Sequence, residues 1–588
     1  MVGPIARRIR LRDQRERRMT TTAPERAAIV ENPEVIASAP DRPRVFVRRW
    51  RGPGLAVAGL FFALSLFPSL LPRPGWVQGV VSGVTLMVGY GLGAGGAALW
   101  RYLGIPNPSG RLGTAVKWVV GGLVVVAVGS SVWQHVGWQN NGRDLLGMEP
   151  TTASLWPTVA VVTILVAGLL LVVSRSLRLL FHSVIGRLAL RLPPRLASVL
   201  GVTALAIVIW LLVSGLLVNG AFALARQGFA PRDSATSAGV VQPTSPKRSG
   251  SPASEVSWDS LGRQGRSFVA TGPTVAELTA ATGPGALEPI RVYAGLKSAD
   301  TIQGRADLVL RELRRTGAFQ RTVLVIATTT GTGFLDPAAV DPLEYLHRGN
   351  TAIAGVQYSY LPSWISLLAD QEAVQQTSLT VFRTVHAYWT TLDPTTRPKL
   401  YLYGLSLGSY GVESILTSVD LVNAPIGGAF LSGPPFVNPL HAELETTRDP
   451  DSPPWRPIVG AGGTVRFTAQ QPVLEDLPGR WGPTRIAYLQ HGSDPIVFFN
   501  GNLTFHSPDW LQDGQRAPDV SDRFTWAPLV TMWQVALDLP SAGSVPWGYG
   551  HLYPASENVY AWAAVTRPFG WDAAQLNSLG TTLDQKLS

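Results

Sequence analysis

Hydrophobic positions are unevenly distributed along the chain, and five long apolar stretches fall within the first 225 residues. Each stretch is close to the roughly 20 residues that a helix needs to cross about 30 Å of hydrocarbon. A single stretch of this kind also occurs as a buried helix of a soluble protein, but five in succession predict a transmembrane bundle over 53–225. The predicted spans are 54–72, 76–100, 114–136, 156–174 and 196–218.

The loops between these stretches differ in charge, and the difference predicts an orientation. Loops 101–117 and 174–195 contain Lys and Arg but no acid, whereas 137–155 has one Arg against two acids. Residues 1–52 form a tail with thirteen Arg against six acids. Because cytoplasmic loops collect Lys and Arg, the tail and both basic loops are expected in the cytoplasm, and five spans then place everything after 225 outside it. The apolar periodicity of 174–195 fits either an amphipathic helix on the inner leaflet or a continuation of the fourth span.

The pattern changes after the fifth stretch. Residues 226–258 are rich in Ser and Pro and poor in apolar side chains, which predicts a flexible linker. From 259 to 588, short runs rich in β-branched residues alternate with helical patterns, which predicts a doubly wound, mostly parallel sheet. The strand candidates are 291–294, 323–327, 351–357, 399–404, 426–433 and 485–492, and the helix candidates include 298–315, 337–347, 369–391 and 556–566.

A G-x-S-x-G pentapeptide, GLSLG at 404–408, lies between a strand candidate and a helical run. In an α/β-hydrolase this pentapeptide forms the nucleophile elbow, a strained turn that exposes the serine hydroxyl. The flanking Gly404 and Gly408 would let the backbone pass close to the helix. The chain has 60 glycines, so the pentapeptide could also be an ordinary turn. Its position between strand and helix favours the elbow, with Ser406 as the nucleophile of a catalytic α/β-hydrolase domain.

A serine nucleophile needs a base, and the base needs an acid to orient it. In this fold the acid and then the histidine follow the serine along the chain. Asp494 lies in the turn after a late strand candidate and His551 lies in the loop GYGHLY, so we predict that they complete the triad. Asp494 could instead merely cap its turn, which would leave Asp451 as the next candidate acid, and His506 is a rival base. His491 is too close to Asp494 and is expected to be structural.

The tetrahedral intermediate also needs N–H donors for its oxyanion. The backbone N–H of Leu407, directly after the nucleophile, is the first candidate. The second should come from the loop after the strand candidate 323–327, where Thr329 or Thr330 is expected to supply it. The same Gly/Thr run could cradle a phosphate, but it lacks the Lys of a P-loop and the spacing of a dinucleotide-binding turn.

Composition excludes several kinds of site and favours one kind of partner. The chain has no cysteine, which excludes a disulfide framework, a thiolate metal site and a cysteine nucleophile. The net charge of +10 arises in the first third, since residues 196–588 carry 26 basic against 31 acidic side chains. This asymmetry favours a membrane over nucleic acid as the partner. We expect neither a metal nor an organic cofactor.

Four longer segments resemble the actinobacterial membrane-anchored α/β-hydrolases, a family with a multi-span N-terminal region and a C-terminal α/β-hydrolase domain. They are TTTGTGFLDPAAVDPLEYL at 328–346, VQYSYLPSW at 356–364, YGLSLGSYG at 403–411 and QHGSDPIV at 490–497. The resemblance covers nearly the whole chain. It implies a serine hydrolase fold, a Ser–Asp–His site at Ser406, Asp494 and His551, and residence in the cell envelope, but it does not identify a substrate.

Together these features predict a multi-pass plasma-membrane protein with a cytoplasmic N terminus and an extracytoplasmic catalytic domain. The expected reaction is hydrolysis of a lipid or cell-envelope acyl ester through an acyl-enzyme, because the domain is tethered beside a membrane. The alternatives are an acyltransferase, in which an alcohol replaces water, and a non-catalytic envelope scaffold or regulator. Protein partners are not predicted. Aromatic residues near the site would suit an apolar acyl group or would pack the core: Trp510, Trp526, Trp533, Trp547 and Tyr549.

Overall fold

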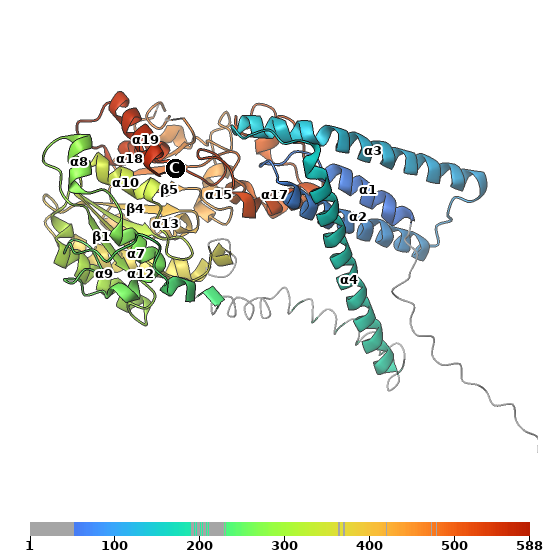
Figure 1. The fold of residues 1–588 in the computed structure, drawn as a ribbon, viewed down its shortest axis with the longest axis horizontal. Coiled ribbons are helices and arrows are strands. Elements are labelled where there is room, and N and C mark those ends of the chain that lie inside the picture. The colour runs from blue at the N-terminus through green and yellow to red at the C-terminus, as the bar shows by residue number, and fades with distance from the viewer. Residues whose placement is uncertain are drawn as a thin grey trace, which may run out of the picture. The chain divides into compact units, whose positions relative to one another are not determined.

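The N-terminal region is helical. The computed structural model describes residues 52–189 and 231–587, apart from 363, 364, 368–370, 419, 472 and 478, and a few isolated positions between 190 and 230. Within these residues the N-terminal helices are α1 (Gly52–Ser65), α2 (Gly75–Tyr102), α3 (Gly110–Leu145) and α4 (Trp156–Ala189), seen in blue to teal in Figure 1.

Three segments of this region are long and apolar enough to span a membrane: Gly75–Tyr102, Gly110–Leu145 and Ala153–Phe181. The first predicted span, 54–72, is wrong in length. Its helix α1 has 14 residues, so at 1.5 Å per residue it is about 21 Å long. Three prolines follow within residues 66–74 and end the helix. The fifth predicted span, 196–218, lies largely outside the described residues.

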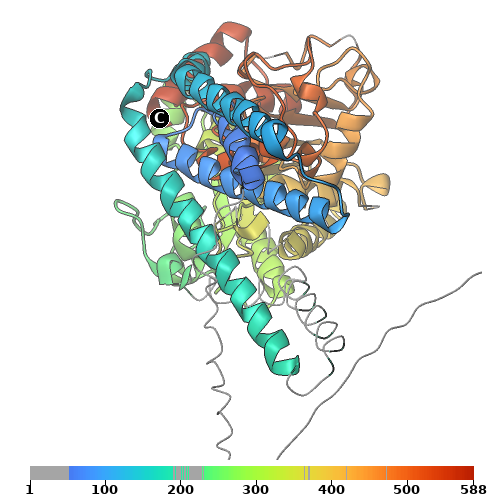
Figure 2. The same cartoon turned by 90° about the vertical axis from the view of Figure 1, so that its right-hand side faces the viewer.

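Helices α2 and α4 pack closely against each other, and Figure 2 shows α4, in teal, crossing the blue α2. A Cβ atom on Gly79 would lie 2.6 Å from Cβ of Val162, and one on Gly83 would lie 2.8 Å from Cβ of Val166. Small residues four apart therefore set this approach, as they do in many membrane helix pairs. Because α4 continues to Ala189, the basic stretch from residue 174 to that point belongs to the same helix as the fourth predicted span.

The C-terminal domain is built on a seven-stranded sheet with strand order β1-β3-β2-β4-β5-β7-β6, in which every pair is parallel. The strands are β1 (Ile290–Ala294), β2 (Val323–Thr328), β3 (Thr351–Val356), β4 (Lys399–Leu405), β5 (Gly428–Ser432), β6 (Val465–Thr468) and β7 (Arg485–Leu489). The predicted doubly wound parallel sheet is confirmed. Only β6, with four residues, was not anticipated, because so short a run carries little pattern of its own.

Helices cover both faces of the sheet, and alternate strand residues point to opposite layers. In β4, Tyr401 and Tyr403 face one core, whereas Leu400 and Leu402 face the other. The first core is covered by α7 (Gly262–Ala270), α8 (Val275–Thr282), α10 (Pro337–Leu346), α18 (Ala555–Thr566) and α19 (Ala573–Leu587). The second is covered by α9 (Ile302–Thr316), α12 (Gln371–Thr390) and α13 (Leu407–Leu416). Shorter helices α14 (Asp420–Asn423), α15 (Pro439–Thr446), α16 (Pro495–Phe498) and α17 (Val530–Asp538) complete the described domain.

The described part of 226–258, the predicted flexible linker, is packed against the C-terminal domain. Ser249 and Ser254 each donate a hydroxyl hydrogen bond of 2.9 Å to the carboxylate of Glu312, and the backbone N–H of Glu255 donates a third. Val256 is buried in the core. The serine-rich composition indicated a solvated chain, but these hydroxyl groups find buried acceptors on α9, so the segment packs as part of the domain.

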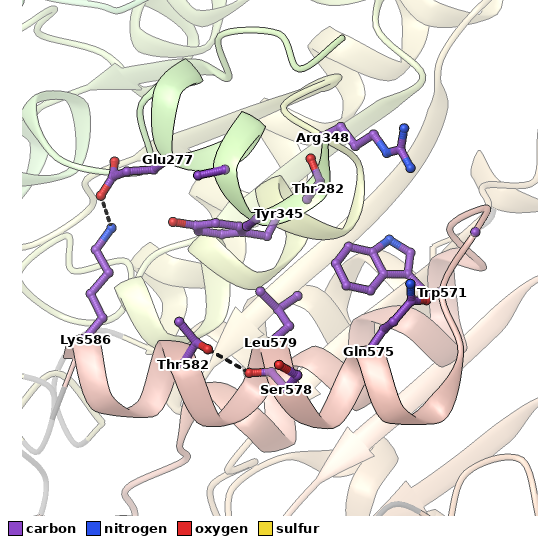
Figure 3. Close-up of a pocket in the computed structure, with 13 residues that line it drawn as sticks. Glu277, Thr282, Tyr345, Arg348, Trp571, Gln575, Ser578, Leu579, Thr582 and Lys586 are labelled. Carbon is purple, nitrogen blue, oxygen red and sulfur yellow. Dashed lines mark hydrogen bonds and ion pairs between the residues drawn. The ribbon is translucent and has the colours of Figure 1, made fainter. Parts of the chain in front are cut away.

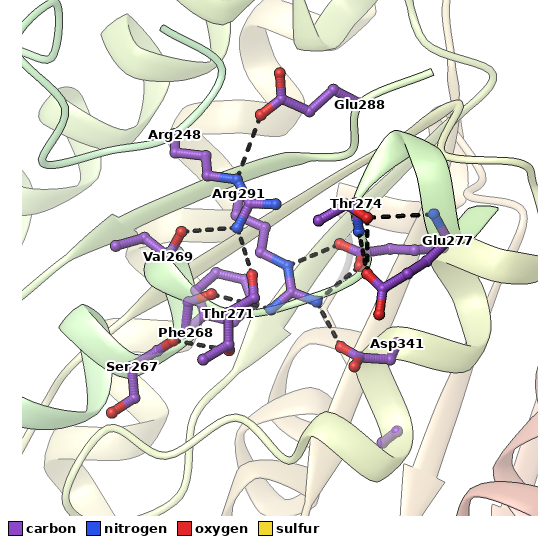
Figure 4. A network of polar contacts seen from close by, with 12 residues as sticks. Arg248, Ser267, Phe268, Val269, Thr271, Thr274, Glu277, Glu288, Arg291 and Asp341 are labelled. Carbon is purple, nitrogen blue, oxygen red and sulfur yellow. Dashed lines mark hydrogen bonds and ion pairs between the residues drawn. The ribbon is translucent and has the colours of Figure 1, made fainter. Parts of the chain in front are cut away.

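Two buried arginines, Arg248 in this segment and Arg291 on the first strand, bind the neighbouring helices, as Figure 4 shows. Arg248 donates to the carbonyl oxygen of Val269 at 2.8 Å. Arg291, on β1, binds Glu344 at 2.7 Å and Asp341 at 2.6 Å, and both carboxylates belong to α10. Burial of a charge is costly unless it is paired, so this network fixes the edge of the sheet against α10.

Candidate active site

Ser406 lies in the turn between β4 and α13, near the centre of the sheet. Its backbone has φ 53° and ψ −129°, a conformation that residues other than glycine rarely adopt. Such a conformation costs on the order of 1–3 kcal/mol and persists only where the surroundings enforce it. One restraint is the 2.8 Å hydrogen bond from the N–H of Ser406 to the carbonyl oxygen of Ser432, at the end of β5. The turn therefore has the strained geometry of a nucleophile elbow.

The two flanking glycines allow this turn. A Cβ atom on Gly404 would lie 2.4 Å from the carbonyl group of Gly408, and one on Gly408 would lie 2.4 Å from the carbonyl oxygen of Thr328. Neither position tolerates a side chain unless the backbone shifts. The motif thus brings the start of α13 against the end of β2, whose following loop is the predicted source of an oxyanion donor.

Asp494 and His551 form a direct pair, although 57 positions separate them in the chain. Asp494 follows β7 and begins α16, where its Oδ1 accepts the N–H of Ile496 at 2.8 Å. Its Oδ2 lies 2.6 Å from Nδ1 of His551 and accepts the hydroxyl hydrogen of Tyr553, also at 2.6 Å. Burial opposes ionisation of Asp494, but the interaction with His551 and these hydrogen bonds outweigh it and lower the pKa of the carboxyl group.

The pairing fixes which ring nitrogen of His551 is free. A carboxylate accepts but does not donate hydrogen bonds, so Nδ1 must carry the proton that lies between the two groups. In the neutral ring, Nε2 then has an unshared electron pair. This atom is buried and has no hydrogen-bond partner among the described residues. The arrangement supplies an oriented base of the kind that a serine nucleophile requires.

The end of β5 brings the histidine and the serine to the same place. Ser432 accepts the backbone N–H of Ser406, as described above. A Cβ atom on the next residue, Gly433, would lie 2.6 Å from Cε1 of His551. The two loops therefore contact consecutive residues at the carboxyl end of one strand, which is where ligands bind in open α/β sheets.

His491 is a second buried histidine beside this pair, and its contacts are those of a structural residue. Its Nε2 lies 2.7 Å from a carboxylate oxygen of Glu557, and its Nδ1 lies 3.0 Å from the carbonyl oxygen of Gly550. Both partners are acceptors, so both ring nitrogens donate and the imidazole is protonated. Burial opposes that charge, but Glu557 outweighs it and raises the pKa of His491. The positive ring thus holds the residue that precedes His551.

The predicted oxyanion donors lie around the same turn. Leu407 is the first residue of α13, where backbone N–H groups have no partner within the helix. Thr329 is buried directly after β2, and its hydroxyl donates to the carbonyl oxygen of Val356. The backbone N–H of Thr330 donates to the carbonyl oxygen of Phe334 at 3.0 Å, so it is engaged within its own loop.

Two residues near the pair were not singled out in the sequence. Tyr553, two positions after His551, donates to the carboxylate of Asp494. Asp336 precedes α10, where it accepts the N–H of Ala338. Desolvation raises its pKa to about 6, and His551 is close enough to oppose that rise. The only sequence signal for Asp336 is the Asp-Pro pair that typically begins a helix.

The rival candidates are placed elsewhere. Asp451 and His506 are exposed. Trp510 is buried in a core with Phe498 and Phe524. It therefore packs the domain, which was the alternative role expected for these aromatic residues.

A pocket of about 660 Å³ lies between α8, the end of α10 and α19, and none of the residues predicted to be catalytic lines it (Figure 3). An ion pair of 2.6 Å between Glu277 and Lys586 closes one side, and Tyr345 and Trp571 supply aromatic walls. Among the described residues, no three His, Asp or Glu side chains are grouped as a metal site would need.

Comparison with known proteins connects both parts of the chain. Residues 290–579 match the model of an alpha/beta-hydrolase family, and residues 66–273 match the model for the N terminus of that family. No curated protein and no solved structure matches the chain. The parallel sheet, the strained Ser406 turn and the preceding helices agree with these two matches. The chain therefore belongs to this α/β-hydrolase family and carries the family's own N-terminal region.

Proposed function

We propose that the protein is a membrane-anchored serine hydrolase that cleaves an ester through a triad of Ser406, His551 and Asp494. The observation that carries the proposal is the contact between the buried carboxylate of Asp494 and His551. It leaves Nε2 of a histidine free beside a strained serine turn at the carboxyl end of the sheet.

In the proposed reaction, Nε2 of His551 takes the hydroxyl proton of Ser406 as its oxygen attacks the ester carbonyl carbon. The carbonyl oxygen gains the negative charge, which the backbone N–H groups of Leu407 and the loop after β2 stabilise. His551 then gives the proton to the leaving alkoxide, and an acyl-enzyme remains. Water repeats the sequence: it loses a proton to His551, the acid is released and Ser406 regains its proton.

The choice between the two loop donors rests on their bonding. Because the N–H of Thr330 is held by Phe334, we propose Thr329 as the second oxyanion donor. An exchange of hydrogen bonds on substrate binding would instead bring Thr330 into the role.

The proposed substrate is a lipid or cell-envelope acyl ester, because the domain is joined to three candidate spans. Acyl transfer to an alcohol uses the same residues and differs only in the second nucleophile. A non-catalytic scaffold would retain the fold but would have no need of a charged acid, an oriented base and a strained serine together.

The proposed address is the plasma membrane, with the catalytic domain outside the cytoplasm. Leu71 and Leu146, in the α1–α2 and α3–α4 connections, pack with Val545 of the C-terminal domain. The α2–α3 connection lies at the other ends of α2 and α3. Its region, 101–117, has three basic residues and no acid, so the positive-inside rule places that end in the cytoplasm.

Covalent labelling tests the enzymatic proposal. A fluorophosphonate should label the purified wild-type protein, whereas Ser406→Ala should lose the labelling. Ser414→Ala is the matched control, because Ser414 lies on α13 and its hydroxyl group donates to the carbonyl oxygen of Tyr410 in its own helix. Labelling that persists in Ser406→Ala would contradict the assigned nucleophile, and unlabelled wild-type protein would favour the scaffold.

A further inference from the structure

The connection between α1 and α2 reaches the region around the proposed active site. Leu70 is 2 % exposed and packs in a core with Val497, three residues after Asp494. Leu71 is also 2 % exposed and packs with Tyr549, two residues before the histidine of the pair. Residues Arg49–Ser588 form one compact unit, so the N-terminal helices and this region are parts of the same folded body.

A buried ion pair lies next to these two leucines. Nε of Arg73 is 2.7 Å from Oδ1 of Asp538, and their side chains are 1 % and 0 % exposed. The hydroxyl group of Ser69 donates to the other carboxylate oxygen. Oε1 of Gln139 on α3 accepts the backbone N–H of Arg73 at 2.8 Å, and Gln78 on α2 accepts from its guanidinium group at 3.3 Å. Two candidate spans thus hold the arginine that pairs with the C-terminal domain.

Asp538 is linked to the histidine by a short length of chain. It is the last residue of α17, and the turn η8 (Leu539–Ser541) follows directly. The next residue, Ala542, accepts the backbone N–H of His551 at 2.9 Å. A displacement of Asp538 would therefore move the carbonyl group that holds His551.

A second contact fixes the same helix. The side-chain amide of Gln534, one turn before Asp538, donates to the carbonyl oxygens of Leu64 and Phe67 at 3.3 and 3.1 Å. Helix α17 is accordingly held at two successive turns by the chain around the end of α1. The N-terminal region contacts α17 through hydrogen bonds and charge as well as through apolar packing.

We propose that Arg73 is a positioning residue of the hydrolase site, through which the N-terminal region holds His551 in place by way of Asp538, α17 and Ala542. This inference rests on the proposed function. It assigns the N-terminal helices a part in catalysis beyond that of an anchor, because the base of the reaction is correctly placed only when they are docked.

The physical reason is the cost of an unpaired buried charge. Burial raises the pKa of Asp538, and Arg73 opposes that rise. Removing one partner of a buried pair leaves the other uncompensated, and the local structure relaxes to relieve it. A misplacement of about 1 Å in a catalytic group can cost on the order of a hundredfold in rate.

The test measures fluorophosphonate labelling of the full-length protein in detergent, with the rate at saturation separated from the affinity for the probe. Arg73→Met should lower the saturated rate by roughly 10- to 100-fold and leave the probe affinity within about twofold, because the base and not the binding site is displaced. Arg73→Lys, which keeps the charge, should recover most of the rate. Arg101→Met is the matched control: Arg101 lies at the other end of α2, is exposed, and its guanidinium group donates to the carbonyl oxygen of Ala97 in its own helix.

The final labelled fraction distinguishes a general loss of folding from a displaced base. Misfolded protein lowers the final extent of labelling, whereas a displaced base lowers the rate at which the folded fraction reacts. If Arg73→Met gives no monodisperse protein, Leu71→Ala and Asp538→Asn are measured in the same way and should show the same loss of saturated rate. A wild-type rate in all folded variants overturns the positioning role while Ser406→Ala still shows the enzyme. Wild-type protein that does not label overturns the proposed function and, with it, this inference.

Discussion

At the scale of single residues, the proposed site depends on a buried carboxylate that remains charged. Asp494 is enclosed by protein, yet three donors point at its two oxygens. These bonds and the interaction with His551 lower its pKa despite burial, so it keeps its negative charge at neutral pH. A fixed anion on Nδ1 is what makes Nε2 the basic atom of the ring.

Asp494→Asn tests this role. The amide would keep the shape of the side chain but could donate toward Nδ1, which would favour the wrong tautomer of His551. We expect the rate of fluorophosphonate labelling to fall by about 10³- to 10⁴-fold, as for the equivalent change in other triads. Asp451→Asn, at the exposed rival acid, should label at the wild-type rate. A loss of less than about tenfold in Asp494→Asn would remove Asp494 from the mechanism.

The residues that sequence reasoning identified at this scale are those with a local signal. Ser406 lies in a pentapeptide, and Asp494 and His551 lie in turn-like segments in the expected chain order. Tyr553 and Asp336 carry no such signal, because their relation to the pair comes from how three distant loops meet. The hydrogen bond from the Thr330 N–H to Phe334 also depends on loop geometry. The sequence therefore could not choose between Thr329 and Thr330 as the oxyanion donor.

At the scale of elements, α18 fastens the two loops that carry the acid and the base. Glu557, on α18, binds His491, and His491 binds the carbonyl oxygen of Gly550. The N–H of Gly550 donates to Ser493, which precedes Asp494. Asp519 and Tyr553 also face this group: Asp519 accepts the N–H of Ser493, and the ring of Tyr553 packs on that of His491.

The ion pair between His491 and Glu557 should make the stability of the fold depend on pH. The folded-state pKa of His491 is raised above its unfolded value of about 6.5. The stabilisation is therefore fully present below about pH 6.5 and is lost as the pH rises through the folded-state value. In thermal unfolding, the wild type should be more stable than Glu557→Gln at low pH, and the difference should shrink as the pH rises.

Glu277→Gln is the control for this prediction, because its ion pair with Lys586 lies on the surface and is screened by solvent. The unfolding temperature of Glu277→Gln should follow that of the wild type throughout the pH range. A difference between wild type and Glu557→Gln that is constant with pH would mean that His491 is neutral in the folded protein.

The sequence predicted the ends of helices correctly where the helical pattern was clear. It misjudged them where tertiary contacts decide the end of the helix. Helices α10 and α18 begin and end within a residue or so of their candidates, 337–347 and 556–566. Helix α1 is shorter than its apolar stretch, because residues 66–74 leave the helix to pack on α17. Apolarity indicates burial, but it does not distinguish burial in lipid from burial against protein.

At the scale of the whole molecule, the charge of the connections and the docking of the C-terminal domain agree on one orientation. The domain packs on the connections after α1 and α3, and the basic connection after α2 lies at the opposite ends of those helices. This arrangement supports the proposed position of the C-terminal domain outside the cytoplasm.

The absence of cysteine in the sequence makes a direct test of orientation possible. Ser109→Cys places a thiol in the exposed α2–α3 connection, and Ser578→Cys places one on the exposed face of α19. In intact cells, a membrane-impermeant maleimide should label Ser578→Cys and spare Ser109→Cys, and both should react after lysis. The reverse pattern would place the catalytic domain in the cytoplasm.

The sequence by itself determined the apolar helices, the alternation that builds a parallel sheet and the serine turn, and it predicted the chain order of the proposed acid and base. These follow from local periodicity and from motifs whose backbone geometry admits few residue types. Only the tertiary structure decided that residues 66–74 pack on α17, that the serine-rich segment before α7 is packed, and that Arg73 meets Asp538. Those outcomes depend on which distant groups can pair when they lose water, and that balance is set by the whole fold.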